Sequence, residues 1–498
     1  MSYPVKTQYF RPLLLAVIVT VFASGCVVQR NPVSGRKRAY GYTWEQEKQI
    51  GSEADPQIIA QFGLYTDEEL SAYVDRIGQA IVAKSHLRRA DTPPEFAGLE
   101  FHFRVLDSPV VNAFALPGGY IYVTRGLLAH VQNEAQLAVV LGHEVGHVAG
   151  RHSSKRALQG QLGQIGLIGG AILGQELLGL PGQDLLSAGS SIAQLLFLRY
   201  GRDDERESDQ LGVEYAALAG YRAEEGAGFF VTLRRLGEQS GQSIPSFMST
   251  HPDPGERETS IREMAADWSA RTPMTLIEER PYLSRVNGIV YGEDPRQGYT
   301  ENGVFYHPQL RFSFPVPDGF QVINQPSQVA MVGPESQAIM VFSIASGQTS
   351  ASAAGQKMAS QEGLTILDRG SARVGGYPAY YIAGDAVTEN QTVRFLSYFI
   401  EYGGNVYQFV GYSTSANFGT YQQQFTRTMT GFSAVGDPAV LNVQPTRVSV
   451  ETVRNGGVFG NVIGTRLPKG TTVETLAILN QLNVDTTIPA NGALKFLQ

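Results

Sequence analysis

The pattern most able to do chemistry is a histidine pair with a glutamate beside the first histidine, H-E-V-G-H at residues 143–147. The apolar run before it, residues 135–142, predicts that the pair lies on a helix. Positions i and i+4 of a helix share a face, so His143 and His147 can reach one metal ion. Zinc suits two imidazoles and a carboxylate, and it keeps a fourth position for water. Zinc makes that water acidic, and Glu144, about 100° round the helix, is placed to take its proton as it attacks a carbonyl.

A third ligand is expected from a second acidic segment, E-R-E-S-D at residues 205–209. Glu205 and Asp209 are four residues apart and share a helix face, whereas Glu207 points to the opposite side. One carboxylate can bind zinc while Asp209 holds the other ring nitrogen of a ligand histidine. His152 falls one residue short of the third histidine of an extended zinc motif, so it is interpreted as a capping or structural residue.

Hydrophobic spacing predicts the elements around these residues. Apolar side chains at 70, 74, 77 and 81 predict a helix at 68–84, and a second helix is expected at 134–152. Strands are predicted at 101–106 and 120–124, on either side of a Pro-Gly-Gly turn. From 46 to 270 the pattern is mostly helical.

Four stretches together resemble the gluzincin metallopeptidase family, which includes the CAAX prenyl protease, the heat-shock membrane protease and the periplasmic β-barrel-assembly-enhancing protease. These stretches are residues 112–119 (NAFALPGG), 143–147, 205–209 and 250–252 (THP). The resemblance implies a mostly α (α+β) zincin-type metalloprotease domain over 46–270 with one Zn²⁺ per chain. Where family members have alanine, this chain has Ser208.

The resemblance also implies roles for single residues. It implies that His143, His147 and Glu205 bind zinc and that Glu144 is the general base. His251 matches a histidine that can approach the zinc and hold the enzyme latent, and a catalytic role in stabilising the oxyanion is the alternative.

The first matching stretch implies how substrate binds. The resemblance makes Asn112, Ala113, Phe114 and Ala115 an edge strand that pairs with the backbone of the substrate. Such pairing tolerates many side chains, so loose sequence specificity is expected.

The only cysteine, Cys26, directly follows a predicted N-terminal export signal. Residues 1–25 hold two basic residues and an 11-residue apolar run (12–22), too short to cross a bilayer of about 30 Å. Ala23-Ser24-Gly25-Cys26 resembles a bacterial lipobox, which implies lipidation of Cys26 and sorting to the periplasmic face of the outer membrane. One cysteine also excludes an intrachain disulfide and a multi-cysteine metal site.

Composition divides the rest of the chain. Residues 26–45 are interpreted as a tether and 271–298, with three prolines, as a linker. A smaller α+β domain is predicted at 299–435. A strand–helix–strand module is predicted at 445–498, where the sequence resembles a lysin motif and glycan binding competes with a structural cap.

These features predict a multidomain zinc endopeptidase of the cell envelope that hydrolyses misfolded or unassembled envelope proteins. Its expected partners are these substrates and, through the lipid anchor, the membrane, with peptidoglycan a further candidate. Only 17% of residues are charged and the net charge is −7, which argues against a nucleic-acid partner. The alternatives are a non-enzymatic lipoprotein, acting as chaperone or peptidoglycan-binding module, and a zinc amidase of peptidoglycan.

Overall fold

The computed structural model describes residues 27–161, 200–240, 251, 254–387, 392–464, 466–468 and 470–498. The predicted lipidation site, Cys26, and the predicted signal peptide at 1–25 lie outside these ranges. The described chain has helices and several separate sheets, as expected of a multidomain protein. Within these ranges, no helix combines the length and apolar character that a bilayer crossing requires.

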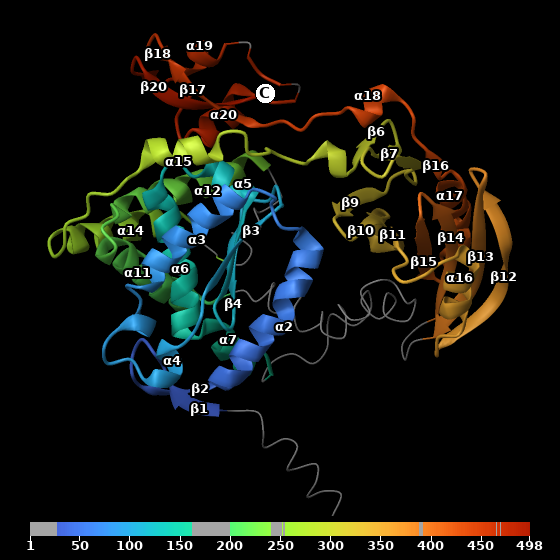
Figure 1. Cartoon of the computed structure of the whole chain (residues 1–498), viewed down its shortest axis with the longest axis horizontal. Helices are drawn as coiled ribbons and strands as arrows, with labels where there is room; N and C mark the ends of the chain where they lie inside the picture. The colour runs from blue at the N-terminus through green and yellow to red at the C-terminus, as the bar shows by residue number, and fades with distance from the viewer. Residues whose placement is uncertain are drawn as a thin grey trace, which may run out of the picture.

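A small sheet supports the region that carries the histidine motif (Figure 1). Its strand order is β3 (His102–Leu106), β5 (Tyr120–Thr124) and β4 (Ala113–Leu116). β3 runs parallel to β5, and β4 runs antiparallel to β5. The strands predicted at 101–106 and 120–124 are confirmed. β4 forms one edge of this sheet.

Helix α3 (Glu68–Val82) confirms the helix predicted from apolar spacing. The side chain of Asp67 caps it by accepting a hydrogen bond from the backbone N–H of Leu70 at 2.9 Å. The predicted apolar face is buried, with at most 1% of each side chain exposed: Leu70, Val74, Ile77 and Ile81.

Helix α6 (Glu134–Gly150) carries the histidine motif and is buried along its whole length. Helix α11 (Arg202–Leu218) packs closely against it. A Cβ on Gly142 would lie 2.9 Å from the carbonyl oxygen of Gly212, so two glycines permit this close approach. The predicted helix at 134–152 breaks at Arg151, whose φ of 58° lies in the left-handed region.

Further helices enclose the same core. The Asp55 carboxylate on α2 accepts hydrogen bonds from Arg104 on β3 and Tyr122 on β5, which ties the helix to the sheet. The helices are α2 (Trp44–Phe62), α5 (Arg125–His130), α7 (His152–Gln161), α12 (Gly226–Ser240) and α14 (Pro254–Ser269).

The segment 26–45, expected to be a tether, is folded against this region from residue 27 onward. It forms a hairpin of β1 (Val27–Arg30) and β2 (Lys37–Tyr40). The side chain of Asn31 donates to the carbonyl of Gly150 at 3.1 Å, and Tyr40 is 1% exposed. This segment is folded although it is polar, because residues more than 100 positions away in the sequence hold it in place through such contacts.

The segment 271–298, expected to be a linker, contributes to the same core. Helix α15 (Glu279–Val286) buries Tyr282, Leu283 and Val286. The Tyr282 hydroxyl donates to the carbonyl of Leu128 at 2.7 Å. Three apolar side chains at helical spacing outweigh the prolines that suggested a linker.

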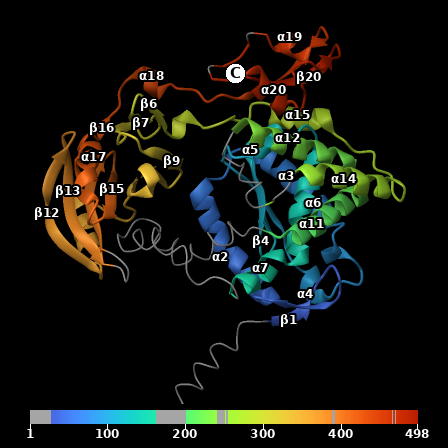
Figure 2. The ribbon, with the colours of Figure 1, turned by 180° about the vertical axis from the view of Figure 1, so that it is seen from behind.

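The region at 299–435 is α+β and lies beside the first region (Figures 1 and 2). Its main sheet has seven antiparallel strands in the order β12-β13-β14-β15-β11-β10-β9. Helix α16 (Ala351–Ala359) covers one face and α17 (Phe418–Thr430) the other. The strands of the sheet are β9 (Gln321–Gln325), β10 (Gln328–Val332), β11 (Ala338–Ile344), β12 (Leu364–Val374), β13 (Tyr377–Val387), β14 (Thr392–Tyr402) and β15 (Asn405–Thr414).

A smaller four-stranded sheet completes this region. Its strands follow the order β16-β8-β7-β6. They are β6 (Tyr299–Glu301), β7 (Val304–His307), β8 (Phe312–Pro315) and β16 (Ser433–Ala434).

The C-terminal segment returns to the first region and packs over α12 and α15 (Figure 1). Strands β17 (Val448–Val453) and β20 (Gly492–Leu497) pair around α20 (Val473–Leu479), as predicted. A second small pair, β18 (Gly457–Val458) and β19 (Thr487–Ile488), and the short helix α19 (Phe459–Ile463) are additional. Its apolar side chains join the same hydrophobic core as α6, so this segment is packed as part of the first region.

Candidate metal centre

Two ligand-type side chains come from helix α6. The Nε2 atoms of His143 and His147 point to the same place and lie 2.9 Å apart. Both side chains are buried, at 3% and 2% exposed. Burial, and then the neighbouring His143, lowers the pKa of His147 well below its usual value. His147 therefore offers a neutral ring with a lone pair, the form that binds metals.

Helix α11 brings a carboxylate to the two histidines. The Glu205 oxygens lie 3.6 Å from the Nε2 atoms of both His143 and His147. Although burial opposes ionisation, His251 and His143 hold the pKa of Glu205 below its usual value. The close packing of the two helices sets this approach.

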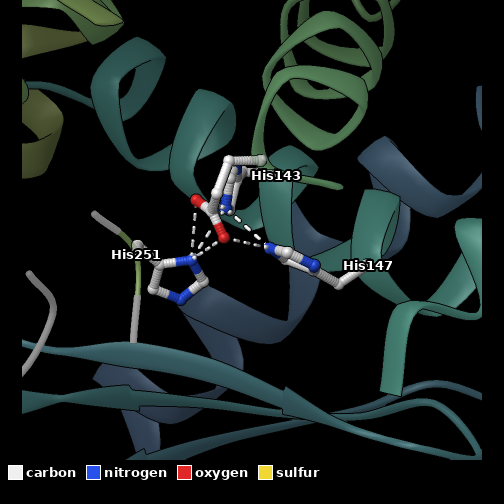
Figure 3. Close-up of side chains that lie close together, drawn as sticks. His143, His147 and His251 are labelled. Atoms are coloured by element: carbon white, nitrogen blue, oxygen red, sulfur yellow. Dashed lines mark hydrogen bonds and ion pairs between the residues drawn. The ribbon is translucent and has the colours of Figure 1, made fainter. Parts of the chain in front are cut away.

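A third histidine completes the cluster. His251 directs its Nδ1 at the Glu205 carboxylate, 2.9 and 3.0 Å from the two oxygens, and at His143 Nε2, 3.3 Å away (Figure 3). One ligand atom from each of His143, His147, Glu205 and His251 lies within 4.8 Å of every other. Although burial opposes protonation, Glu205 holds the pKa of His251 above its usual value.

Glu144 lies beside this cluster. Its side chain is 0% exposed, and neither carboxylate oxygen has a hydrogen-bond partner among the described residues. The nearest charged partner is His251, whose Nε2 lies 3.8 Å from Glu144 Oε1. Burial raises the pKa of Glu144 above its usual value. A buried carboxylate without partners is costly, so it points to a group that the described side chains do not supply.

The donors fit a zinc ion. Imidazole nitrogens with one carboxylate are a ligand set that zinc favours. Three buried carboxylates (Glu144, Glu205 and Asp209) face one buried guanidinium (Arg257). Because these carboxylates outnumber the guanidinium, the site attracts positive charge, which His251 or a divalent metal ion can supply.

The predicted partner of a ligand histidine, Asp209, contacts the ring of His143. Its Oδ1 lies 2.9 Å from His143 Nδ1. Burial opposes its ionisation, but Arg257 and His143 hold the pKa of Asp209 at about 2. An ionised Asp209 accepts a hydrogen bond from the Nδ1–H of His143, so the lone pair of that ring is on Nε2 and can bind a metal.

Arg257, on α14, was not predicted from the sequence. It donates to both oxygens of Asp209, at 2.8 and 2.5 Å, and lies 3.1 Å from Glu205. Its guanidinium also lies over the ring of Phe230, at 4.3 Å. No motif marks this residue, because its partners are 48 and 52 positions away in the sequence.

His152, predicted to be a capping or structural residue, lies in the site. Its Nδ1 is 2.9 Å from the Nδ1 of His147. Tyr200, which the sequence did not single out, stacks on the face of the His147 ring, with ring centroids 4.0 Å apart. The ring of His147 is therefore held from two directions.

The predicted substrate-binding strand corresponds to Asn112 and strand β4. Asn112 pairs with Thr124 of β5, whose backbone N–H donates to the Asn112 carbonyl at 3.0 Å. Antiparallel pairing alternates, so the backbone groups of Ala113 and Ala115 are directed away from β5, toward the open edge. Phe114 stacks on Tyr122 of β5, with ring centroids 4.9 Å apart.

A large cavity lies elsewhere in the molecule. It has a volume of about 1230 Å³ and lies between the C-terminal end of α2 and the β9–β10 hairpin, both of which line it. None of the four clustered ligand residues lines it. The chemistry is therefore assigned from the donor cluster and not from this cavity.

Comparison with known proteins agrees with this geometry. Residues 69–265 match the model of peptidase family M48. The chain is 30% identical to the beta-barrel assembly-enhancing protease of Yersinia pestis over 259 residues, which is 50% of each protein. It is 28% identical to the mitochondrial metalloendopeptidase OMA1 of Schizosaccharomyces pombe over 236 residues, covering 47% of this chain and 65% of that protein.

The match to these relatives is partial, since the chain spans about half the length of the Yersinia protein. The predicted family resemblance is confirmed by the M48 match, whose range includes all four clustered donors. Residues 69–265 therefore match a peptidase family M48 domain, and the four clustered donors fit the zinc ion that such metallopeptidases use.

Proposed function

We propose that the protein is a zinc endopeptidase that hydrolyses peptide bonds in misfolded or unassembled envelope proteins. The observation that carries this proposal is the buried Glu144 carboxylate, which has no hydrogen-bond partner among the described residues and lies beside four converging metal donors. A structural zinc site does not require such a base. A hydrolytic site does, because the attacking water must lose a proton.

The chain's own residues divide the work as follows. His143, His147 and Glu205 hold the ion, while Asp209 and Arg257 orient His143. A bound zinc ion supplies Lewis acidity, which acidifies a coordinated water and polarises the scissile carbonyl. Glu144 accepts the proton of the attacking water and returns it to the leaving amine. The carboxylate is buried beside the donors and has no hydrogen-bond partner among the described residues, so it can exchange a proton with a water held there.

His251 controls access in this proposal. Its Nδ1 lies within the donor group, so His251 would be able to act as a further ligand to a bound zinc ion and hold the enzyme latent. Substrate then has to displace it. In the catalytic alternative, the displaced His251 donates a hydrogen bond to the oxyanion.

The substrate class rests on strand β4 and on the relatives. The open-edge backbone groups of Ala113 and Ala115 pair with an extended segment of any sequence, and unfolded proteins expose such segments. One relative is named a beta-barrel assembly-enhancing protease, which supports substrates among envelope proteins.

We propose further that Cys26 carries a lipid anchor that holds the protein at the periplasmic face of the outer membrane. The support is the lipobox-like sequence, and β1 begins at the next residue, Val27. The folded core would then lie directly at the membrane surface. Palmitate labelling that persists in Cys26→Ser would contradict the anchor.

The proposal is tested with the full chain purified in detergent, using unfolded casein as substrate. Wild type is expected to bind about one zinc ion and to cleave casein, and a chelator should abolish cleavage until zinc is restored. Glu144→Gln should retain zinc and lose cleavage. Equal cleavage by Glu144→Gln would contradict the mechanism, and zinc binding without cleavage by wild type would favour the non-enzymatic alternative.

The same assay decides the role of His251. If it holds the enzyme latent, His251→Ala raises the cleavage rate. If it stabilises the oxyanion, the same substitution lowers the rate, and the latency proposal is wrong.

A further inference from the structure

The two histidines of α6 that face the donor cluster have different hydrogen-bond partners at Nδ1. His143 Nδ1 contacts the anionic Asp209, whereas His147 Nδ1 contacts the imidazole of His152 at 2.9 Å. His152 is 0% exposed, so water does not compete for this contact. The Nδ1 atoms of two imidazole rings form a hydrogen bond only if one carries a proton and the other presents a lone pair.

The direction of that hydrogen bond follows from the cluster. His147 directs its Nε2 at His143 and Glu205, so this nitrogen has to present its lone pair to a metal. The proton of the His147 ring is then on Nδ1. The Nδ1 of His152 must therefore accept it.

Glu207 sets the matching tautomer of His152. Its Oε2 lies 3.3 Å from His152 Nε2. An ionised carboxylate only accepts, so Nε2 of His152 carries the proton and Nδ1 has the lone pair. The Ser208 hydroxyl lies 3.2 Å from the same Nδ1. That nitrogen has one lone pair, which the His147 N–H uses, so Ser208 is a neighbour and not a second donor.

The backbone is shaped to admit the ring of His152. The left-handed conformation of Arg151 ends α6 and turns the chain back, so that His152 lies behind His147. A Cβ at Gly150 would collide with His152 Nε2. The position of the ring is thus built into the turn between α6 and α7.

We propose that His152, with Glu207 behind it, is a positioning residue that fixes the tautomer and orientation of His147 for zinc. This inference rests on the proposed function, since it assumes that His147 binds the metal through Nε2. Outer hydrogen-bond partners of metal ligands typically change metal affinity by about 10- to 100-fold.

The test measures the zinc dissociation constant of the full chain by competition with a chromogenic chelator. His152→Phe keeps a ring but removes the acceptor, and we expect it to weaken binding by roughly 10- to 100-fold. His152→Asn places an amide oxygen near the position of Nδ1, and we expect it to recover most of the loss. The visible spectrum of the Co²⁺-loaded protein should change in His152→Phe and be close to wild type in His152→Asn. His86→Phe, at a histidine that contacts Tyr215 and not the cluster, is the control and should leave zinc affinity unchanged.

Glu207→Gln keeps the inference testable if His152→Phe does not fold. The Glu207 side chain is 25% exposed, so the substitution is tolerated easily. We expect it to weaken zinc binding several-fold, because an amide holds the His152 tautomer less firmly. Glu214→Gln removes a carboxylate two turns further along α11, where it pairs with Arg89, and should have no effect.

The outcomes are distinct. Wild-type zinc affinity in both His152→Phe and Glu207→Gln, or an Asn variant as weak as the Phe variant, would overturn the positioning role and leave the proposed function intact. Failure of the wild-type chain to bind zinc would overturn the proposed function and this inference with it.

Discussion

Lys495 offers a sharp test of whether the C-terminal segment is an integral part of the peptidase core. Its side chain is 0% exposed, and its Nζ donates to the carbonyls of Ala129 and Val131 at 2.7 and 2.5 Å. These carbonyls lie at the C-terminal end of α5, where backbone acceptors lack helical partners. Lys495→Met keeps the volume of the side chain and removes both donors.

The expected loss of stability in Lys495→Met follows from the two backbone carbonyls that lose their hydrogen-bond donor. Each buried, unsatisfied group costs roughly 1–3 kcal/mol. Removing a buried ammonium returns part of this cost. We therefore expect Lys495→Met to lower the free energy of unfolding by about 2–4 kcal/mol. With a urea m-value of about 3 kcal/mol per M, the midpoint moves down by roughly 1 M.

Tryptophan fluorescence is the right assay because both tryptophans of the chain, Trp44 and Trp268, lie in or against the core that Lys495 joins. The urea transition that it reports is therefore that of the peptidase core. Lys84→Met, at an exposed lysine of the same region, is the matched control and should stay within about 0.5 kcal/mol of wild type. An unmoved midpoint in Lys495→Met would show that the C-terminal segment is energetically separate.

The pH dependence of the same variant has a defined sign. Burial lowers the pKa of Lys495 well below its ordinary value of 10.5. Between the folded and unfolded pKa values the unfolded chain binds one more proton, so wild-type stability rises with pH, by up to about 1.4 kcal/mol per unit. The Met variant lacks this gain, and its deficit should widen as pH rises toward 10.5. A deficit that narrows over pH 7–10 would contradict the assigned shift.

Three further predictions concern the site. Gly142→Ala should lower the free energy of unfolding by about 1–3 kcal/mol and weaken zinc binding, because the new Cβ meets the backbone of Gly212. The control is Gly419→Ala, in a helix with open space around it, which should be neutral or stabilising. Equal effects of the two substitutions in thermal unfolding would contradict this account. Arg257→Lys should weaken zinc affinity about tenfold or more in chelator competition, since an ammonium cannot reproduce the bidentate contact to Asp209. Unchanged zinc affinity would show that Arg257 does not orient the His143 ligand through Asp209. Ala115→Pro should reduce casein cleavage with zinc content unchanged, because it removes an open-edge N–H, and full cleavage would exclude β4 as the substrate strand.

Several features followed from local sequence. The helix with apolar positions 70, 74, 77 and 81, and the strand at 120–124, have the positions that their periodicity indicates. The placement of His143 and His147 on one face follows from the 3.6-residue turn of a helix. In all these cases the interacting residues lie within a few positions of each other, so backbone geometry alone relates them.

Other expectations depended on composition and were less reliable. The polar segment at 27–45 and the proline-rich segment at 271–298 had the character of connectors, yet both are folded against the core. Composition reports the average polarity of a segment. It does not report which distant carbonyl or apolar surface is available to hold that segment.

The sequence by itself indicated a zinc-type donor set, because the H-E-x-x-H pattern and the second acidic segment are short and their spacing is that of a helix turn. Only the tertiary structure showed that Arg257 holds Asp209, that His152 contacts His147, and that Lys495 joins the core. The physical reason is distance along the chain. Such contacts depend on how helices and sheets pack, for example on the close approach of α6 and α11, and no local periodicity encodes that approach.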